Sequence, residues 1–264
     1  MTTMQPSPPP VSYSSSARDP RIGWIRLNRP EQRNAINNEM AVALLDAVTA
    51  FEEDPAARVA ILGGVGPVFC AGMDLAAFST GERPGLDDED GFAYFVRRRR
   101  RKPIVAAVQG AAFAGGFEIM LACDLVVAAT GTRFGLPEVK RGIIAAGGGA
   151  IRLPSRISPV VAREMLLTGD PITSERAYEL GLLNAVVPEE DLERAAEALA
   201  ARIAGNAPLS IAASAALCEV ATSVGEAEGW AATMRQWRKV EASDDAKEGT
   251  IAFKEKRQPV WRGR

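Results

Sequence analysis

Two short apolar segments separated by a glycine-containing turn and an apolar helix constrain the fold of this chain most strongly. Residues 104–108 (IVAAV) and 124–129 (DLVVAA) each predict a strand that is buried on both faces. Between them, three glycines precede the mostly apolar run Phe117–Cys123, which predicts a helix. Strands that alternate with helices are typical of α/β domains. We therefore expect an α/β core whose sheet is covered on both sides.

The amino-terminal part of the chain shows a similar alternation. Residues 21–28 (RIGWIRLN) alternate apolar and polar side chains and predict a strand, and residues 59–62 (VAIL) predict another. A helix is expected between them, with Asn37 or Asn38 as its N-cap. Its apolar face is formed by Met40, Leu44, Val48 and Phe51. The Ser- and Pro-rich residues 1–18 predict a flexible tail.

After about residue 160 the pattern changes from alternating to mainly helical. One further strand is expected at 185–187. Helices are expected at 162–167, 174–180, 192–203, 209–224, 226–239 and 244–256. We therefore expect residues 19–200 to form the α/β core and residues 201–264 to form a helical carboxyl-terminal region.

Composition excludes several kinds of chemistry. Histidine is absent from the 264 residues, which excludes Ser-His-Asp and Cys-His catalysis and histidine-based zinc sites. The three cysteines (Cys70, Cys123 and Cys218) include no C-x-x-C pair and predict free thiols in a reducing compartment. A net charge of -2 gives no general attraction to nucleic acid or to membranes. Neither a signal peptide nor a membrane span is expected.

Glu118 is the first candidate for acid–base chemistry. It lies two residues after Gly116 and is flanked by Phe117 and Ile119. Partial desolvation in this setting should raise the pKa of the carboxyl group and prepare it for proton transfer near neutral pH. The preceding glycines and the unpaired N–H groups of the helix start could hold an oxyanion. The alternative is that Glu118 only favours the amino end of the helix.

Glu138 is the second candidate. It follows Pro137 in the turn-rich segment 134–142 (FGLPEVKRG). The helix, strand and turn between the two glutamates return the chain on itself, so both carboxyl groups can face one cleft. Two carboxyl groups around one substrate can divide acid and base roles. The alternative is that Glu138 is an ordinary loop charge.

Residues 67–75 (PVFCAGMDL) form a third notable segment. Gly72 interrupts the chain after a strand, and Asp74 can cap a following helix. Alone, this segment indicates only a loop.

Together, these segments resemble the crotonase (enoyl-CoA hydratase/isomerase) family. The resemblance lies in F-C-A-G-M-D-L at 69–75, the glycine-rich segment 108–124 and F-G-L-P-E at 134–138. Segments 152–154, 167–170 and 255–261 also fit, so it covers about residues 20–261. The sequences G-G-F-E, L-P-E-V-K-R-G and E-K-R-Q-P-V-W-R-G-R are especially similar to crotonobetainyl-CoA (carnitinyl-CoA) hydratases.

The resemblance implies a spiral of β-β-α units with a carboxyl-terminal helical trimerisation region. It implies that the backbone N–H groups of Met73 and Gly115 stabilise a thioester enolate. Glu118 would activate water and Glu138 would exchange a proton with the α-carbon, giving a 3-hydroxyacyl-CoA without a metal or redox cofactor. Residues expected to contact the substrate are Ala71, Asp74, Leu75, Gly116, Pro137, Phe253 and Lys256, and the last two match positions that in relatives approach the adenine and phosphates of CoA, sometimes from a neighbouring subunit.

The chain also departs from the family pattern. Ala114 replaces the first glycine of a triple, which is tolerable if its φ is negative. Met73 replaces a commoner alanine and should reshape the pocket. Ala76 stands where many members carry Lys or Arg, which removes one expected phosphate contact. The run 145–149 (AAGGG) replaces the usual P-G-x-G-G and predicts an unusual acyl pocket.

The expected function is therefore an enoyl-CoA hydratase in the cytoplasm, a homotrimer or dimer of trimers with an acyl-CoA substrate and no nucleic-acid or membrane partner. Alternatives are a Δ3-Δ2 isomerase, a carnitinyl-CoA dehydratase-like enzyme, or a non-catalytic acyl-CoA- or RNA-binding protein. The run Arg97–Arg101 is interpreted as a solvated helix end, a funnel for CoA phosphates or an RNA-binding patch. Residues 81–91 predict a mobile loop that forms either an active-site rim or a plain surface insertion.

Overall fold

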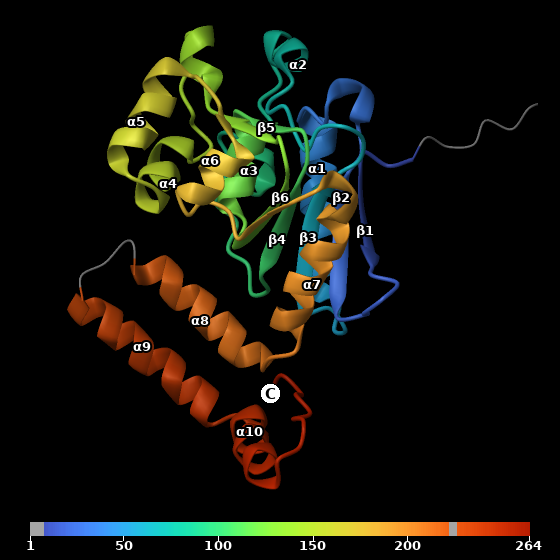
Figure 1. Cartoon of the computed structure of the whole chain (residues 1–264), viewed down its shortest axis with the longest axis vertical. Coiled ribbons are helices and arrows are strands. Elements are labelled where there is room, and N and C mark those ends of the chain that lie inside the picture. Colours follow the sequence, from blue (N-terminus) through green and yellow to red (C-terminus); the bar gives the residue numbers. More distant parts are fainter. Residues whose placement is uncertain (1–7, 222–225) are drawn as a thin grey trace, which may run out of the picture.

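A six-stranded sheet forms the centre of the computed structural model, which describes residues 8–221 and 226–264 (Figure 1). β1 pairs antiparallel with β2, whereas the other neighbouring strands of this sheet are parallel. The spatial order is β1 (Val11–Ser15), β2 (Ile22–Leu27), β3 (Val59–Gly64), β4 (Ile104–Val108), β6 (Leu125–Ala129) and β9 (Ala185–Val187).

Strand β1 shows that the flexible tail predicted for residues 1–18 is wrong for the second half of this segment. Val11 pairs with Leu27 and is buried, and the Tyr13 hydroxyl donates a hydrogen bond of 2.7 Å to Asp54. An edge strand needs few apolar residues, because its other face can remain in solvent, and this is why serine-rich residues can form it. Residues 1–7 lie outside the described part of the chain.

A second, three-stranded sheet completes the β-β-α units. It contains β7 (Arg133–Gly135) between β5 (Ala111–Phe113) and β8 (Ile172–Thr173). β4 leads through a tight turn into β5 and then into helix α3 (Gly115–Ala122). Gly110 makes the turn at a φ of +63°, where an added Cβ would lie 1.9 Å from the Pro67 carbonyl oxygen. β6 leads in the same way into β7, so the expected α/β spiral is confirmed.

Helices cover both faces of the large sheet. α1 (Asn38–Glu53) and α3 pack on one face, and α7 (Leu192–Ala204) packs on the other (Figure 1). Alternate residues of each strand point to opposite faces, so that in β3 Leu62 contacts the first cluster and Ile61 the second. The predicted apolar face of α1 is buried, and Asn37 is its N-cap, accepting a hydrogen bond from the Met40 N–H.

Further helices surround this core and form an arm. Besides the helices on the large sheet, the core carries α2 (Leu75–Ser79), α4 (Gly149–Arg156), α5 (Pro159–Thr168) and α6 (Ser174–Glu179). Short 3-10 helices occur at Pro30–Gln32, Phe92–Tyr94, Pro137–Arg141 and Glu189–Asp191. The arm consists of α8 (Pro208–Ala221), α9 (Glu226–Glu241) and α10 (Asp244–Glu255). Residues 222–224 of the helix expected at 209–224 lie outside the described part.

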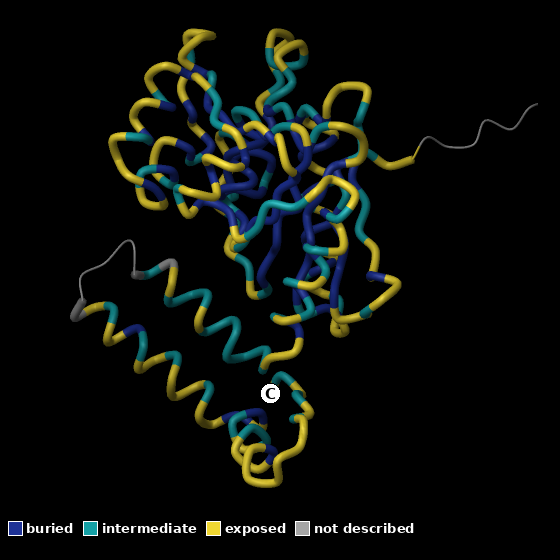
Figure 2. The backbone as a smooth tube through the Cα atoms, in the orientation of Figure 1, coloured by how far each residue is buried: buried dark blue, intermediate teal, exposed yellow. Residues whose placement is uncertain are grey.

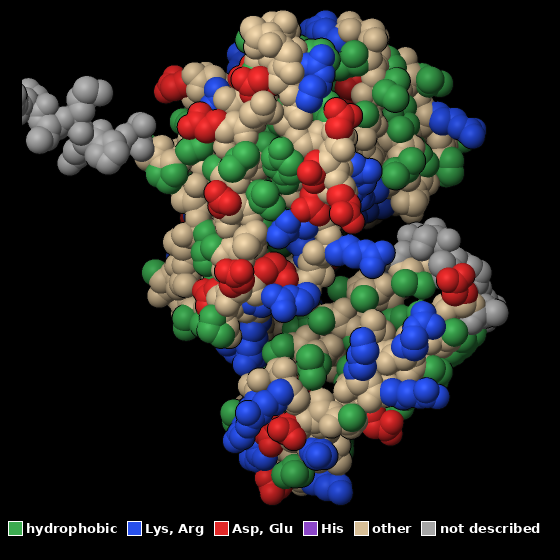
Figure 3. Space-filling model, turned by 180° about the vertical axis from the view of Figure 1, so that it is seen from behind, with side chains coloured by type: hydrophobic (Ala, Val, Ile, Leu, Met, Phe, Trp, Pro, Cys, Tyr) green, Lys and Arg blue, Asp and Glu red, His purple; other side chains and the backbone are tan. Residues whose placement is uncertain are grey.

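The arm extends away from the core, and its helices are less buried (Figures 1 and 2). α8 and α9 lie side by side, and the last residues return to the core, where Arg58 donates hydrogen bonds to the carbonyl oxygens of Ala204 and Trp261. Trp230, Trp237 and Phe253 of α9 and α10 are 61%, 53% and 86% exposed. Lys and Arg side chains gather around the junction of arm and core (Figure 3). None of the described helices is both long and apolar enough to cross a membrane.

Candidate active site

One cavity of about 740 Å³ contains most of the residues expected from the sequence to form a site. It lies where β5, α3 and the segment after β7 meet, and residues 71–75 form part of its wall. The predicted residues that line it are Ala71, Met73, Leu75, Gly115, Glu118, Pro137 and Glu138. The two glutamates, twenty positions apart, therefore face a common space.

The Glu118 carboxyl group is buried in the first turn of α3, with only 4% of the residue exposed. Its Oε1 atom accepts a hydrogen bond of 2.8 Å from the Gly149 N–H. Burial raises the pKa of Glu118 to about 7, and the nearby charge of Glu138 acts in the same direction. Hydrogen bonding from the backbone of Gly149 and Gly147 and the charge of Arg152 oppose this rise. This carboxyl group can exchange protons near neutral pH.

The Glu138 carboxyl group is also buried, in the 3-10 helix Pro137–Arg141. Burial raises the pKa of Glu138 above its ordinary value. Its Oε2 atom is buried and has no hydrogen-bond partner among the described residues. A buried, unpartnered carboxyl oxygen at a cavity wall is available to a ligand, since leaving it unpaired costs free energy.

Two backbone N–H groups belong to residues that line the same cavity as these acids. Among the described residues, no acceptor is found for the N–H of Met73 or of Gly115. The two segments are in contact, because a Cβ added to Gly72 would lie 3.1 Å from the Gly115 nitrogen. Gly115 is the first residue of α3, where N–H groups lack intrahelical acceptors. Paired free amides of this kind can hold a carbonyl oxygen that gains negative charge.

Ala114, at the start of α3, does not meet the condition expected of it. Its φ is +49° and its ψ is −128°, whereas the sequence required a negative φ for an alanine at this position. A residue with a Cβ is strained in this region of backbone space. The strain accompanies the sharp bend that leads into Gly115, a residue of the cavity lining.

Other predicted contacts lie elsewhere in the chain. Asp74 caps α2 by accepting hydrogen bonds from the Ala76 and Ala77 N–H groups, as predicted, but it does not line the cavity. Gly116 is packed against Cys70, whose carbonyl oxygen would lie 2.3 Å from an added Cβ. Phe253 and Lys256 are exposed on the arm and do not line the cavity of their own chain. Their contact with substrate remains a prediction that requires a neighbouring subunit.

The structure also adds site residues that sequence reasoning missed. Gly147 and Gly149 wrap the Glu118 carboxyl group, and an added Cβ on Gly147 would lie 2.4 Å from Oε2. The unusual run 145–149 was the available signal for this contact. Arg33 and Arg141 bring positive charge to the cavity wall. The aromatic part of the lining consists of Phe78, Phe92 and Phe113. Leu86, from the loop 81–91, also lines the cavity. The loop 81–91 is therefore part of the rim.

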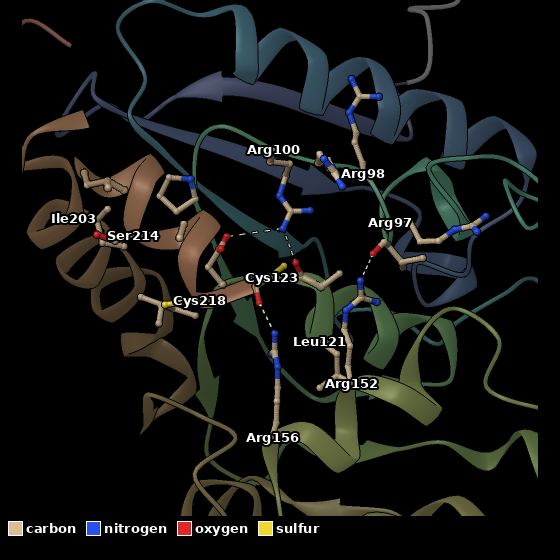
Figure 4. Close-up of a pocket in the computed structure, with 18 of the residues that line it drawn as sticks. Arg97, Arg98, Arg100, Leu121, Cys123, Arg152, Arg156, Ile203, Ser214 and Cys218 are labelled. Carbon is tan, nitrogen blue, oxygen red and sulfur yellow. Dashed lines mark hydrogen bonds and ion pairs between the residues drawn. The ribbon is translucent and has the colours of Figure 1, made fainter. Parts of the chain in front are cut away.

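Arg97–Arg100 of the arginine run line a different cavity, of about 920 Å³, at the amino ends of β4 and β6 (Figure 4). This cavity shares no lining residue with the glutamate cavity, so the structure does not support a CoA funnel. The expected helix end is wrong, since residues 97–102 are not helical. The guanidinium groups instead bond to neighbouring groups: Arg98 to Asp90, Arg100 to the Ala122 carbonyl oxygen and Arg101 to Glu52.

Comparison with known proteins decides the family. The family model described as enoyl-CoA hydratase/isomerase matches residues 18–264. The chain belongs to the enoyl-CoA hydratase/isomerase family. The resemblance inferred from the motifs is thereby confirmed.

Individual relatives in the family agree with this assignment. The carnitinyl-CoA dehydratase of Proteus mirabilis is 38% identical over 247 residues, which cover 91% of this chain and 94% of that protein. The carnitinyl-CoA dehydratase of Salmonella typhimurium is 40% identical with the same coverage. The crystal structure of an enoyl-CoA hydratase from Mycobacterium tuberculosis superposes with a TM-score of 0.92 at 44% identity and covers 97% of this chain and 100% of that chain.

Proposed function

We propose that this protein is an enoyl-CoA hydratase that adds water across the 2,3 double bond of a 2-enoyl-CoA thioester. The observation that carries the proposal is one cavity lined by two buried carboxyl groups and by Met73 and Gly115, whose backbone N–H groups have no acceptor among the described residues. Hydration needs both parts of this arrangement. The amides stabilise the enolate oxygen, and the acids handle the two protons of the reaction.

The proposed reaction begins with the thioester oxygen between the N–H groups of Met73 and Gly115. The ionised Glu118 takes a proton from water as the hydroxyl oxygen forms its bond to C3 and the C2=C3 electron pair moves toward the thioester. The negative charge that develops on the thioester oxygen is stabilised by about 3 kcal/mol per amide donor. The protonated Glu138 then delivers its proton to C2, which yields the 3-hydroxyacyl-CoA.

The raised pKa values of both acids suit this division of roles. Glu118, with a pKa of about 7, is partly ionised at neutral pH and can act as the base. The raised pKa of Glu138 favours the protonated form that serves as the acid. Water and protons are the only species exchanged, so we propose that the reaction uses no metal or redox cofactor and that coenzyme A enters only as part of the substrate.

The substrate would enter past Arg33 and Arg141, whose positive charges suit the phosphates of CoA. They compensate for Ala76, which stands where relatives carry a cation. Ala71, Leu75 and Pro137 contribute small and apolar surface for the thioester arm and acyl chain. Phe253 and Lys256 would reach this site from an adjoining subunit.

Oligomerisation is proposed to follow the family pattern of a homotrimer or a dimer of trimers. The large apolar side chains exposed on α9 and α10 support this, because such groups are costly to leave in water. Sedimentation analysis should show a mass of three or six chains, and a monomer at micromolar concentration would contradict the proposal. We also propose that the enzyme works in the cytoplasm, where its three unpaired thiols stay reduced.

A carnitinyl-CoA dehydratase-like activity is the second candidate, because relatives of that name share 38–40% of their residues with this chain. A trimethylammonium group favours aromatic and acidic neighbours. The cavity offers three phenylalanine rings and two glutamates, but Arg33 and Arg141 oppose a cationic substrate. Trp24, Tyr94 and Trp230 do not line this cavity.

One experiment separates the candidates. The purified protein is mixed with a panel of 2-enoyl-CoAs, including crotonyl-CoA and crotonobetainyl-CoA, and of 3-enoyl-CoAs. A hydratase removes the conjugated enoyl-thioester absorbance of crotonyl-CoA, whereas an isomerase creates this absorbance from a 3-enoyl-CoA. Preference for crotonobetainyl-CoA would favour the second candidate.

Two outcomes would favour a non-catalytic function. Saturable crotonyl-CoA binding without any absorbance change would indicate a binding protein. RNA binding that weakens steeply with salt and is lost when Arg97–Arg101 are neutralised would indicate an RNA-binding protein.

A further inference from the structure

Arg152 lies in the first turn of α4. The glycine loop 147–149 contacts Arg152 on one side and Glu118 on the other. The guanidinium group donates a hydrogen bond of 3.4 Å from Nη1 to the Gly147 carbonyl oxygen. It packs directly on Gly148, where an added Cβ would lie 2.2 Å from the same nitrogen. Arg152 thus contacts the loop that holds the Glu118 carboxyl group.

The same guanidinium group ties this loop to a second part of the site. Nη2 donates a hydrogen bond to the Val96 carbonyl oxygen, and Figure 4 shows Arg152 reaching across from α4 toward the segment that contains Arg97. Earlier in this segment, Phe92 packs over Gly115, where an added Cβ would lie 2.3 Å from the ring. Arg152 therefore connects the loop around Glu118 with the segment that covers a proposed oxyanion donor.

The loop needs such an anchor because it has no side chains of its own. Gly147, Gly148 and Gly149 follow one another, and Gly148 has a φ of +103° that glycine adopts easily. Consecutive glycines are conformationally free, so the Gly149 N–H would be poorly fixed without outside contacts. Its hydrogen bond to Oε1 of Glu118 depends on the position of this backbone.

We propose that Arg152 is a positioning residue for Glu118, which it orients indirectly by clamping the backbone of Gly147–Gly149 against the Val96 segment. This inference rests on the proposed hydratase function. Arg152 has a second effect through its charge, which favours the ionised form of Glu118 and opposes the effect of Glu138. Both effects support the base form of Glu118 at neutral pH.

The test compares Arg152→Gln, Arg152→Lys and the matched control Arg156→Gln in crotonyl-CoA hydration. Arg156 is on the same helix, but its guanidinium group bonds to the Cys123 carbonyl oxygen. Arg152→Gln should lower kcat by about 10- to 100-fold with KM nearly unchanged, because the base is misplaced. The acid limb of its kcat–pH profile should move to higher pH, because removal of the cation raises the pKa of Glu118.

Arg152→Lys retains the charge and should keep the acid limb near that of the wild type while recovering only part of kcat. If Arg152→Gln does not fold, this lysine variant still tests the proposal. It should lose kcat without a shift of the acid limb of the kcat–pH profile. Arg156→Gln should leave both readouts unchanged. The proposal is overturned if Arg152→Gln retains kcat within about twofold, if its acid limb does not move, or if Arg156→Gln loses as much activity.

A titration independent of activity distinguishes this inference from the proposed function. Infrared difference spectra against Glu118→Gln report the protonation of Glu118 in the wild type and in Arg152→Gln. A midpoint that moves to higher pH in Arg152→Gln supports the action of Arg152 on Glu118 even if the wild type hydrates no enoyl-CoA, and an unchanged midpoint rejects it.

Discussion

The Gly149 N–H donates a 2.8 Å hydrogen bond to Oε1 of Glu118, across 31 positions of the chain. This contact joins a buried helix start to a loop without side chains. It fixes one oxygen of the carboxyl group, and the burial of this group raises its pKa. A buried carboxyl group held in this way combines a defined direction with a proton affinity suited to neutral pH.

The burial of Glu118 should make the protein less stable as pH rises. The folded protein retains the Glu118 proton up to about pH 7, whereas the unfolded chain loses it near pH 4.3. Between these values the unfolded state binds fewer protons, so the free energy of unfolding falls with pH, by on the order of 3 kcal/mol for this group.

Glu118→Gln removes this dependence and should therefore be more stable than the wild type near pH 8, with a smaller difference near pH 5. Thermal unfolding followed by circular dichroism at both pH values measures the two differences. Glu138 is present in both proteins, and because its charge acts on the pKa of Glu118, the comparison measures the loss of Glu118 together with this coupling. Equal differences at the two pH values would show that Glu118 has an ordinary pKa in the folded state.

Gly147→Ala should reduce hydration without unfolding the protein. The new Cβ would lie 2.4 Å from Oε2 of Glu118, so the carboxyl group must move. A displacement of this size at a reacting group should lower kcat by about 100-fold. Gly205→Ala is the control, since its Cβ would meet its nearest neighbour at 3.4 Å. Activity of Gly147→Ala close to that of the control would mean that the observed direction of Glu118 is not required.

Ala114→Gly should stabilise the protein. Ala114 has a φ of +49°, and relief of this strain should raise the free energy of unfolding by about 1 kcal/mol. Urea unfolding measures the change. Ala198→Gly, on the exposed face of α7, should have the opposite effect, a loss of about 1 kcal/mol. Destabilisation by both glycines would show that Ala114 is not strained.

Sequence patterns predicted the elements whose burial follows a simple period. The face of α1 was readable because Met40, Leu44, Val48 and Phe51 recur at helical spacing. The convergence of Glu118 and Glu138 followed from the order helix, strand and turn. Strand β1 was missed because only one of its faces packs on the core, and serine-rich edge strands lack a strong apolar signal.

The remaining features depend on contacts that are distant in sequence. The φ of Ala114 is set by the meeting of the segments around Gly72 and Gly115, which no local pattern encodes. Gly147 and Gly149 could be recognised as unusual, but their contact with Glu118 required the tertiary fold. The arginine run contains no helix, and its side chains bond to groups such as Glu52 and Asp90, which local charge patterns do not identify.

The most direct test of the central claim is the rate of crotonyl-CoA hydration by Glu118→Gln and Glu138→Gln, with the exposed Glu190→Gln as control. Both cavity variants should lose about 10²- to 10⁴-fold in kcat, because each removes a group that transfers a proton, and the control should match the wild type. Loss only in Glu138→Gln would favour isomerisation, and full hydration activity in both cavity variants would contradict the account.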